Sequence, residues 1–143
     1  MLADDLMAGY SGTPLPKKLG IKERARVALL DVPAEVQAEL KEALASCELV
    51  SDRRALDFVF LFCKKQSELT RQFSRIAKRL APAGALWVAW PKKTSGVPSE
   101  LNENEVRRIG LQAGLVDVKV CAVDEVWSGL KFVIRVKDRG SRS

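Results

Sequence analysis

Hydrophobic and polar positions along the chain predict strands and helices in alternation. Strand-like runs, each short, apolar and rich in aliphatic or aromatic residues, occupy residues 26–31, 56–63, 85–90, 116–123 and 131–136, with a vestigial one at Leu49-Val50. The first three runs contain almost no polar positions, which is typical of strands covered on both faces of a parallel sheet. We therefore expect a sheet whose central strands are fully buried.

Between these runs, apolar residues recur every three or four positions, which indicates amphipathic helices at 33–46, 67–80 and 103–113. Parallel neighbouring strands need right-handed helical crossovers, so strand and helix in alternation predict helices on both faces of the sheet. The two final strands follow each other without a helix and should pair antiparallel. The sequence thus predicts an α/β, Rossmann-like fold with a mostly parallel sheet and a C-terminal antiparallel strand pair.

The two ends of the chain show neither the apolar runs of strands nor the helical spacing of apolar residues. Residues 1–25 mix turn formers with apolar residues, and we expect an ordered, extended arm that wraps the α/β core of residues 26–136. Tyr10, Ser11 and Thr13 in this arm either pack against the core or close over a cleft as a lid. Residues 137–143 form a basic tail that we expect to be frayed and solvated.

Composition narrows the class of protein. The 143 residues are 47% hydrophobic and 29% charged, which suits a single domain over residues 1–143. No apolar run approaches the roughly 20 residues that cross a bilayer, and the acidic start MLADD is unlike a secretory signal. We expect a cytoplasmic protein without membrane association.

Reactive residue types are scarce. The sequence has no histidine, which removes the usual general base near neutral pH and the usual metal ligand. Cys47, Cys63 and Cys121 stand far apart and are expected to be plain buried thiols, so no metal site is predicted. A net charge of +6 favours anionic partners such as nucleotides, nucleic acid or acidic proteins.

Residues 76–91, IAKRLAPAGALWVAWP, resemble the junction before the fifth strand of class I S-adenosylmethionine-dependent methyltransferases. The resemblance implies that residues 56–62 are the fourth strand of that fold, 85–91 the fifth and the terminal pair the sixth and seventh. Asp57 matches the acidic residue near the start of the fourth strand, where its role is more structural than catalytic. The chain then looks like a truncated methyltransferase fold.

The same resemblance implies a cofactor loop after the first strand, built on a Gly-x-Gly turn. Here the corresponding residues 30–34, LDVPA, contain no glycine. Val32 adds bulk and Pro33 removes an N–H where backbone must approach the cofactor closely. The acidic residue that would hold the ribose also has no clear counterpart. We therefore expect no cofactor, and S-adenosylmethionine should bind weakly or not at all.

Over nearly its whole length the chain is also similar to a bacterial family of small proteins of unknown function. The shared segments are GYSGTPL at residues 9–15, WPKK-x-SG at 90–96 and DE-x-WSGLK at 124–131. This similarity implies the same fold but no assigned activity.

In open α/β sheets, ligands bind outside the carboxyl ends of the strands where the winding direction reverses. By the methyltransferase template that point lies between the strands that end at Asp31 and Cys63. We expect Lys64, Lys65, Lys92 and Lys93 to converge there, beside Asp31, Trp90 and the N-terminus of the helix that starts near Pro33. One interpretation is a pocket for phosphate, a nucleotide or nucleic acid; the other is a rim of solvated lysines.

Two further groups have two interpretations each. Trp87, Trp90 and Trp127 either pack in the core or offer stacking surfaces to a base. Asp124 and Glu125 either shape a turn or form a carboxylate pair, although neighbouring strand residues point to opposite faces.

Taken together, the sequence predicts a non-catalytic methyltransferase-like domain that binds an anionic ligand or a protein partner. The alternatives are a minimal methyltransferase with an unusual cofactor loop, or a structural protein that assembles, for example as a homodimer through an exposed edge strand.

Overall fold

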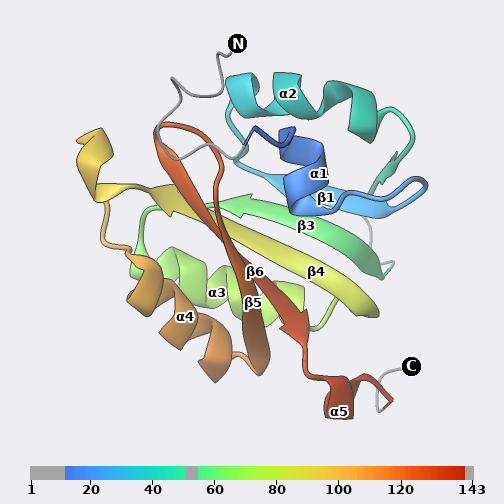
Figure 1. The fold of residues 1–143 in the computed structure, drawn as a ribbon. Coiled ribbons are helices and arrows are strands. Elements are labelled where there is room, and N and C mark those ends of the chain that lie inside the picture. The colour runs from blue at the N-terminus through green and yellow to red at the C-terminus, as the bar shows by residue number, and fades with distance from the viewer. Residues whose placement is uncertain (1–11, 51–54, 141–143) are drawn as a thin grey trace.

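The computed structural model describes residues 12–50 and 55–140. These residues form one six-stranded sheet in the order β2-β1-β3-β4-β6-β5 (Figure 1). The strands are β1 (Arg26–Leu30), β2 (Glu48–Leu49), β3 (Leu56–Phe62), β4 (Leu80–Pro91), β5 (Leu115–Ala122) and β6 (Trp127–Ile134). Strands β2, β1, β3 and β4 run parallel, whereas β6 is antiparallel to both β4 and β5. The predicted fold class is confirmed.

Helices cover both faces of the sheet (Figure 1). The helical elements are α1 (Leu15–Leu19), α2 (Ala34–Leu44), α3 (Gln66–Ala77), α4 (Glu103–Gln112), α5 (Val136–Arg139) and a 3-10 turn at Lys93–Ser95. Helices α1 and α2 lie on one face, and α3 and α4 lie on the other. Helix α5 occupies part of the tail that was predicted to be frayed, and residues 141–143 lie outside the described residues.

Alternation along β3 divides its side chains between two apolar layers. Phe58, Phe60 and Phe62 pack toward α1 and α2, whereas Val59 and Leu61 pack toward α3 and α4. All five are buried, because both faces of the strand are covered. This arrangement is what the uninterrupted apolar run predicted.

The described part of the N-terminal arm packs against the sheet through Leu15 and Leu19, but it is not extended as predicted, because it contains the short helix α1. Pro16 stands in its first turn, where the missing N–H is not needed, and Gly20 ends it with a φ of 76°. Leu19 is buried, and its carbonyl accepts a hydrogen bond of 2.9 Å from Nε1–H of Trp87 in β4. Tyr10 and Ser11 lie outside the described residues.

The junction between α3 and β4 differs from the prediction. Helix α3 ends at Ala77 rather than near Leu80, and β4 begins at Leu80 rather than Ala85. Leu80 pairs with Leu56 and Ala85 pairs with Phe58, so the residues between them form a bulge in the strand. A side chain at Gly84 would come within 2.6 Å of a backbone oxygen of β3, which is why glycine fits there.

The turn before β6 is also shorter than predicted, since the strand begins at Trp127 rather than Lys131. The Asp124 carboxylate accepts hydrogen bonds of 2.8 Å from the N–H groups of Val126 and Trp127, which closes a tight turn. The structural interpretation of Asp124 is therefore confirmed. Asp57 has a structural role too, because its carboxylate accepts a 2.9 Å hydrogen bond from the N–H of Arg26 in β1.

The cysteines are all free, but only Cys63 is buried, whereas Cys47 and Cys121 are half-buried. The described part of the chain contains no helix long and apolar enough to cross a membrane. It also contains no cluster of three or more acidic or cysteine side chains that would hold a metal ion.

Candidate functional site

A pocket lies at the topological switch point of the sheet. The chain leaves β1 through α2 to reach β2 on one side, and then continues to β3 on the other side of β1. At the carboxyl ends of β1 and β3 a cavity of about 380 Å³ opens. It is lined by Asp31, Pro33, Phe62, Cys63, Lys64, Lys65, Glu68 and Trp127. The structure thus brings Asp31, Lys64 and Lys65 together at the predicted place.

The loop after β1 has an unusual backbone. Asp31 adopts a φ of 58°, in the left-handed region that Asp tolerates better than most residues. Val32 is only 7% exposed and packs in the core beside α2. Its carbonyl accepts a 3.0 Å hydrogen bond from Nε2 of Gln37, and Pro33 precedes the first residue of α2 without an N–H to offer. The loop is therefore held against its own helix.

Charges around the switch-point pocket balance. Lys64 and Lys65 leave β3 as exposed side chains, and Glu68 follows one turn later on α3. Asp31 faces the same cavity from the end of β1. The lining therefore holds two ammonium groups and two carboxylates, and Glu68 is the member that the sequence did not single out. The sequence held one sign of this role: Glu68 stands four residues after Lys64, in the first turn of the helix that follows β3.

One wall of the pocket is aromatic. Trp127 is half-buried and packs edge-on against Phe62, with ring centroids 4.8 Å apart and planes at 69°. The Lys64 ammonium lies 6.0 Å from the centroid of the Trp127 ring, at the limit of a cation–π contact. Trp127 is thus the tryptophan that presents a ring to the pocket, in keeping with the stacking interpretation.

The other tryptophans are core residues. Trp87 is fully buried, as predicted, and Trp90 is only 5% exposed, with its ring packed in the layer that faces α3 and α4. Trp90 therefore offers no stacking surface at the switch-point pocket. Its side chain points away from the face on which Trp127 and Phe62 lie, because neighbouring strand positions alternate.

Lys92 and Lys93 do not reach the switch-point pocket. Together with Trp90 they line a separate cavity of about 450 Å³ beyond the end of β4. The segment after the 3-10 turn separates the two cavities, since the Glu100 N–H donates a 2.9 Å hydrogen bond to the Lys64 carbonyl. The expected convergence of two lysine pairs on one crevice is not what the structure has.

The same segment occupies the N-terminus of α3. The Glu100 carboxylate accepts a 2.9 Å hydrogen bond from the N–H of Gln66, the first residue of that helix. A carboxylate in this place uses a donor that would otherwise attract an anion. The N-terminal end of α2, at Pro33, borders the switch-point pocket as well, together with Lys65 at the start of α3.

Cys63 is the one thiol in the pocket lining. Burial raises the pKa of its thiol, and Sγ donates a 3.4 Å hydrogen bond to the Lys65 carbonyl. The group therefore stays protonated at neutral pH, and a protonated thiol is a poor nucleophile.

The family model described as "Protein of unknown function (DUF3052)" matches residues 17–136. The chain belongs to the DUF3052 family. No curated protein sequence matches it.

Solved structures show which fold this DUF3052 chain shares. A methyltransferase from Aquifex aeolicus that depends on S-adenosylmethionine is 19% identical, with a TM-score of 0.53 over 81% of this chain and 85% of its own. The fibrillarin of Aeropyrum pernix, solved with natively bound S-adenosylmethionine, is 14% identical, with a TM-score of 0.52 over 92% and 73%. A TehB-like methyltransferase from Corynebacterium glutamicum is 9% identical, with a TM-score of 0.52 over 90% and 91%. At these identities the likeness concerns the fold, and it confirms a methyltransferase-like architecture.

Proposed function

We propose that this DUF3052 protein is a non-catalytic domain of methyltransferase fold that binds a nucleotide in the switch-point pocket. The observation that carries the proposal is the lining of that pocket, in which Lys64, two carboxylates and the Trp127 ring surround one cavity. Its volume of about 380 Å³ is at the small end of the range for ligand pockets.

The balanced charge favours a nucleotide over bare phosphate. A phosphate group suits Lys64 and Lys65, but on its own it would also face the carboxylates of Asp31 and Glu68. A nucleotide separates these demands, because its phosphate is anionic, its ribose hydroxyls donate hydrogen bonds to carboxylates and its base has a flat face for Trp127.

S-adenosylmethionine fits this pocket less well. The cofactor loop of the methyltransferase fold relies on backbone that approaches the ligand closely, whereas here Val32 fills the space beneath the loop and Pro33 lacks an N–H. Groups for chemistry are also scarce, since the chain has no histidine and Cys63 is held as a thiol. These features support binding rather than catalysis.

The test is isothermal titration calorimetry with AMP and with S-adenosylmethionine at low salt. A second measurement records the tryptophan fluorescence while AMP is added. AMP should bind and change the emission, because Trp87 and Trp90 are buried and only Trp127 borders the pocket. The variant Lys64→Gln should weaken AMP at least tenfold, and Trp127→Phe should remove the fluorescence change.

The matched control is Lys93→Gln, which removes the same charge from the neighbouring cavity and should leave AMP binding unchanged. Equal losses in Lys64→Gln and Lys93→Gln would reject the pocket, as would an absence of AMP binding. A dissociation constant for S-adenosylmethionine of about 10 µM or tighter, near −7 kcal/mol, would instead favour a working methyltransferase.

A further inference from the structure

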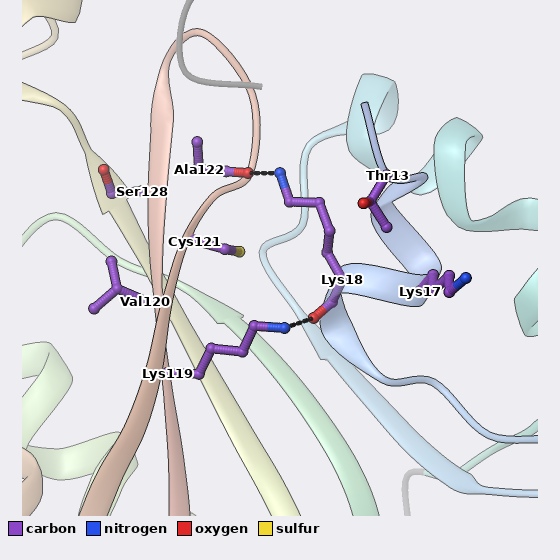
Figure 2. Close-up of a pocket in the computed structure, with 8 residues that line it drawn as sticks. All are labelled: Thr13, Lys17, Lys18, Lys119, Val120, Cys121, Ala122 and Ser128. Atoms are coloured by element: carbon purple, nitrogen blue, oxygen red, sulfur yellow. Dashed lines mark hydrogen bonds between the residues drawn. The ribbon is translucent and has the colours of Figure 1, made fainter. Parts of the chain in front are cut away.

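A third cavity, of about 780 Å³, lies between α1 and β5, away from the switch point (Figure 2). One side is formed by Thr13, Lys17 and Lys18 of the arm, and the other by residues 119–122 of β5 with Ser128 of β6. Three of these lining side chains are lysines and none is acidic. This composition differs from the balanced charge of the switch-point pocket.

The sheet register adds further positive charge beside this cavity. Lys119 of β5 stands directly opposite Lys131 of β6. A side chain at Gly20 would come within 4.0 Å of the Lys131 ammonium, so that ammonium lies against the end of α1. Burial lowers the pKa of Lys131, and the charges of Lys119 and Lys22 lower it further. Five lysines thus gather here, at positions 17, 18, 22, 119 and 131, and we call them the lysine groove.

Hydrogen bonds orient two ammonium groups of the lysine groove, those of Lys18 and Lys119, toward backbone oxygens (Figure 2). Lys18 Nζ donates to the Ala122 carbonyl at 2.7 Å, and Lys119 Nζ donates to the Lys18 carbonyl at 3.2 Å. A carbonyl carries no formal charge to offset that of Lys119. Within residues 12–50 and 55–140, no ion pair involves Lys17, Lys22, Lys119 or Lys131.

Two acidic side chains lie near one end of the groove. Burial raises the pKa of Glu39, the nearby Asp124 raises it further and Lys18 lowers it, so these two carboxylates lie near the Lys18 end. The rest of the groove keeps like charges together, and cross-strand pairs of like charge are unfavourable for the fold. A ligand with negative charges spread along the groove would relieve that repulsion.

We propose that the lysine groove binds a ligand with several phosphate groups in a row. A single phosphate would meet only part of a cluster that extends from α1 to β5 and β6, whereas a chain of phosphates can meet several of its ammonium groups at once. Two sources share this chemistry, the backbone of a single-stranded nucleic acid and an inorganic polyphosphate. The proposal is independent of nucleotide binding at Lys64.

The experiment uses the full chain and a fluorescently labelled single-stranded oligonucleotide of about 12 nucleotides, with anisotropy measured over a range of salt concentrations. If all five lysines neutralise a phosphate, log K should fall against log salt with a slope of about −3.5, at about 0.7 per phosphate. The double variant Lys22→Gln, Lys119→Gln should reduce this slope by about 1.4 and weaken binding at low salt at least tenfold. Both side chains are exposed, so the variant should fold normally, with a melting temperature that is unchanged or slightly raised because a cross-strand repulsion is removed.

The matched control is Arg71→Gln, Lys78→Gln, which removes two exposed charges on and next to α3, on the other face of the sheet. It should bind the oligonucleotide like the wild type, as should Lys64→Gln. Competition with unlabelled ligands distinguishes the two sources. If tripolyphosphate displaces the labelled oligonucleotide, the groove accepts polyphosphate. If only unlabelled oligonucleotide displaces it, the groove is selective for the nucleic acid backbone. Absence of binding at low salt, or an equal loss in both double variants, would overturn the proposal.

Discussion

Gly110→Ala is expected to destabilise the protein, although alanine is normally the better helix residue. Gly110 lies inside α4, where a Cβ would come within 2.2 Å of Cε2 and 2.7 Å of Cζ of Phe132. Real side chains do not approach so closely, so the ring or the helix must move. Phe132 is fully buried in β6 and cannot retreat easily, because it packs edge-on against Phe73 with centroids 4.9 Å apart.

Two opposing effects set the magnitude. Replacing glycine in a helix interior favours folding by about 1 kcal/mol, whereas overpacking a tight core costs about 1 to 3 kcal/mol. Here the contacts are far below van der Waals distance, so we expect a cost at or above the upper end of that range. The free energy of unfolding should fall by about 2 kcal/mol, which lowers the melting temperature by roughly 4 to 8 °C for a chain of this size.

Urea denaturation measures this change as a lower midpoint with an unchanged m-value. The control is the same substitution in a Phe132→Leu background, where the smaller side chain leaves room for the new methyl group. There Gly110→Ala should be neutral or stabilising, so the cycle should show a coupling of about 2 kcal/mol. A single variant Gly110→Ala as stable as the wild type would refute the close packing of Phe132 against α4.

Three other predictions follow from single contacts. Trp87→Phe should lower the free energy of unfolding by about 2 kcal/mol or more, because it leaves the Leu19 carbonyl buried without its hydrogen bond, and it should speed proteolysis near Leu19. A variant as stable as the wild type would mean that the arm is not anchored there. Asp31→Ala should lower the free energy of unfolding by about 1 kcal/mol while Asp31→Gly does not, since glycine adopts a φ of 58° freely and aspartate tolerates it better than alanine. Equal melting temperatures of the two variants would count against that backbone. Lys131→Gln should stabilise the fold by roughly 0.2 to 1 kcal/mol at neutral pH by removing a cross-strand repulsion. The pKa of Lys131 is lowered in the folded state, so the unfolded chain binds more protons just below pH 10.5 and wild-type stability should rise with pH there; a variant that keeps the same rise would exclude Lys131 as its source.

Local pattern predicted the elements that are almost entirely apolar. Residues 56–63 and 85–90 were identified as central strands because nearly all their side chains are apolar, with Asp57 as the one charged residue, and β3 and β4 lie there. The boundaries were less certain, because they depend on partners. The strand β4 begins at Leu80 because that residue pairs with Leu56. Helix α1 was missed because its five residues are too few to show the helical repeat of apolar positions.

The candidate sites show the same division. The resemblance to the methyltransferase fold placed Asp31, Lys64 and Lys65 at one edge of the sheet, because it made their two strands neighbours and the carboxyl ends of neighbouring parallel strands meet there. Only the tertiary structure separated Lys92 and Lys93 from them, through the hydrogen bond from Glu100 to the Lys64 carbonyl. It also set Lys119 opposite Lys131 and brought both to the lysines of α1. Hydrophobic period is a property of neighbouring residues, whereas strand register and contacts between distant segments are decided by how the whole core packs.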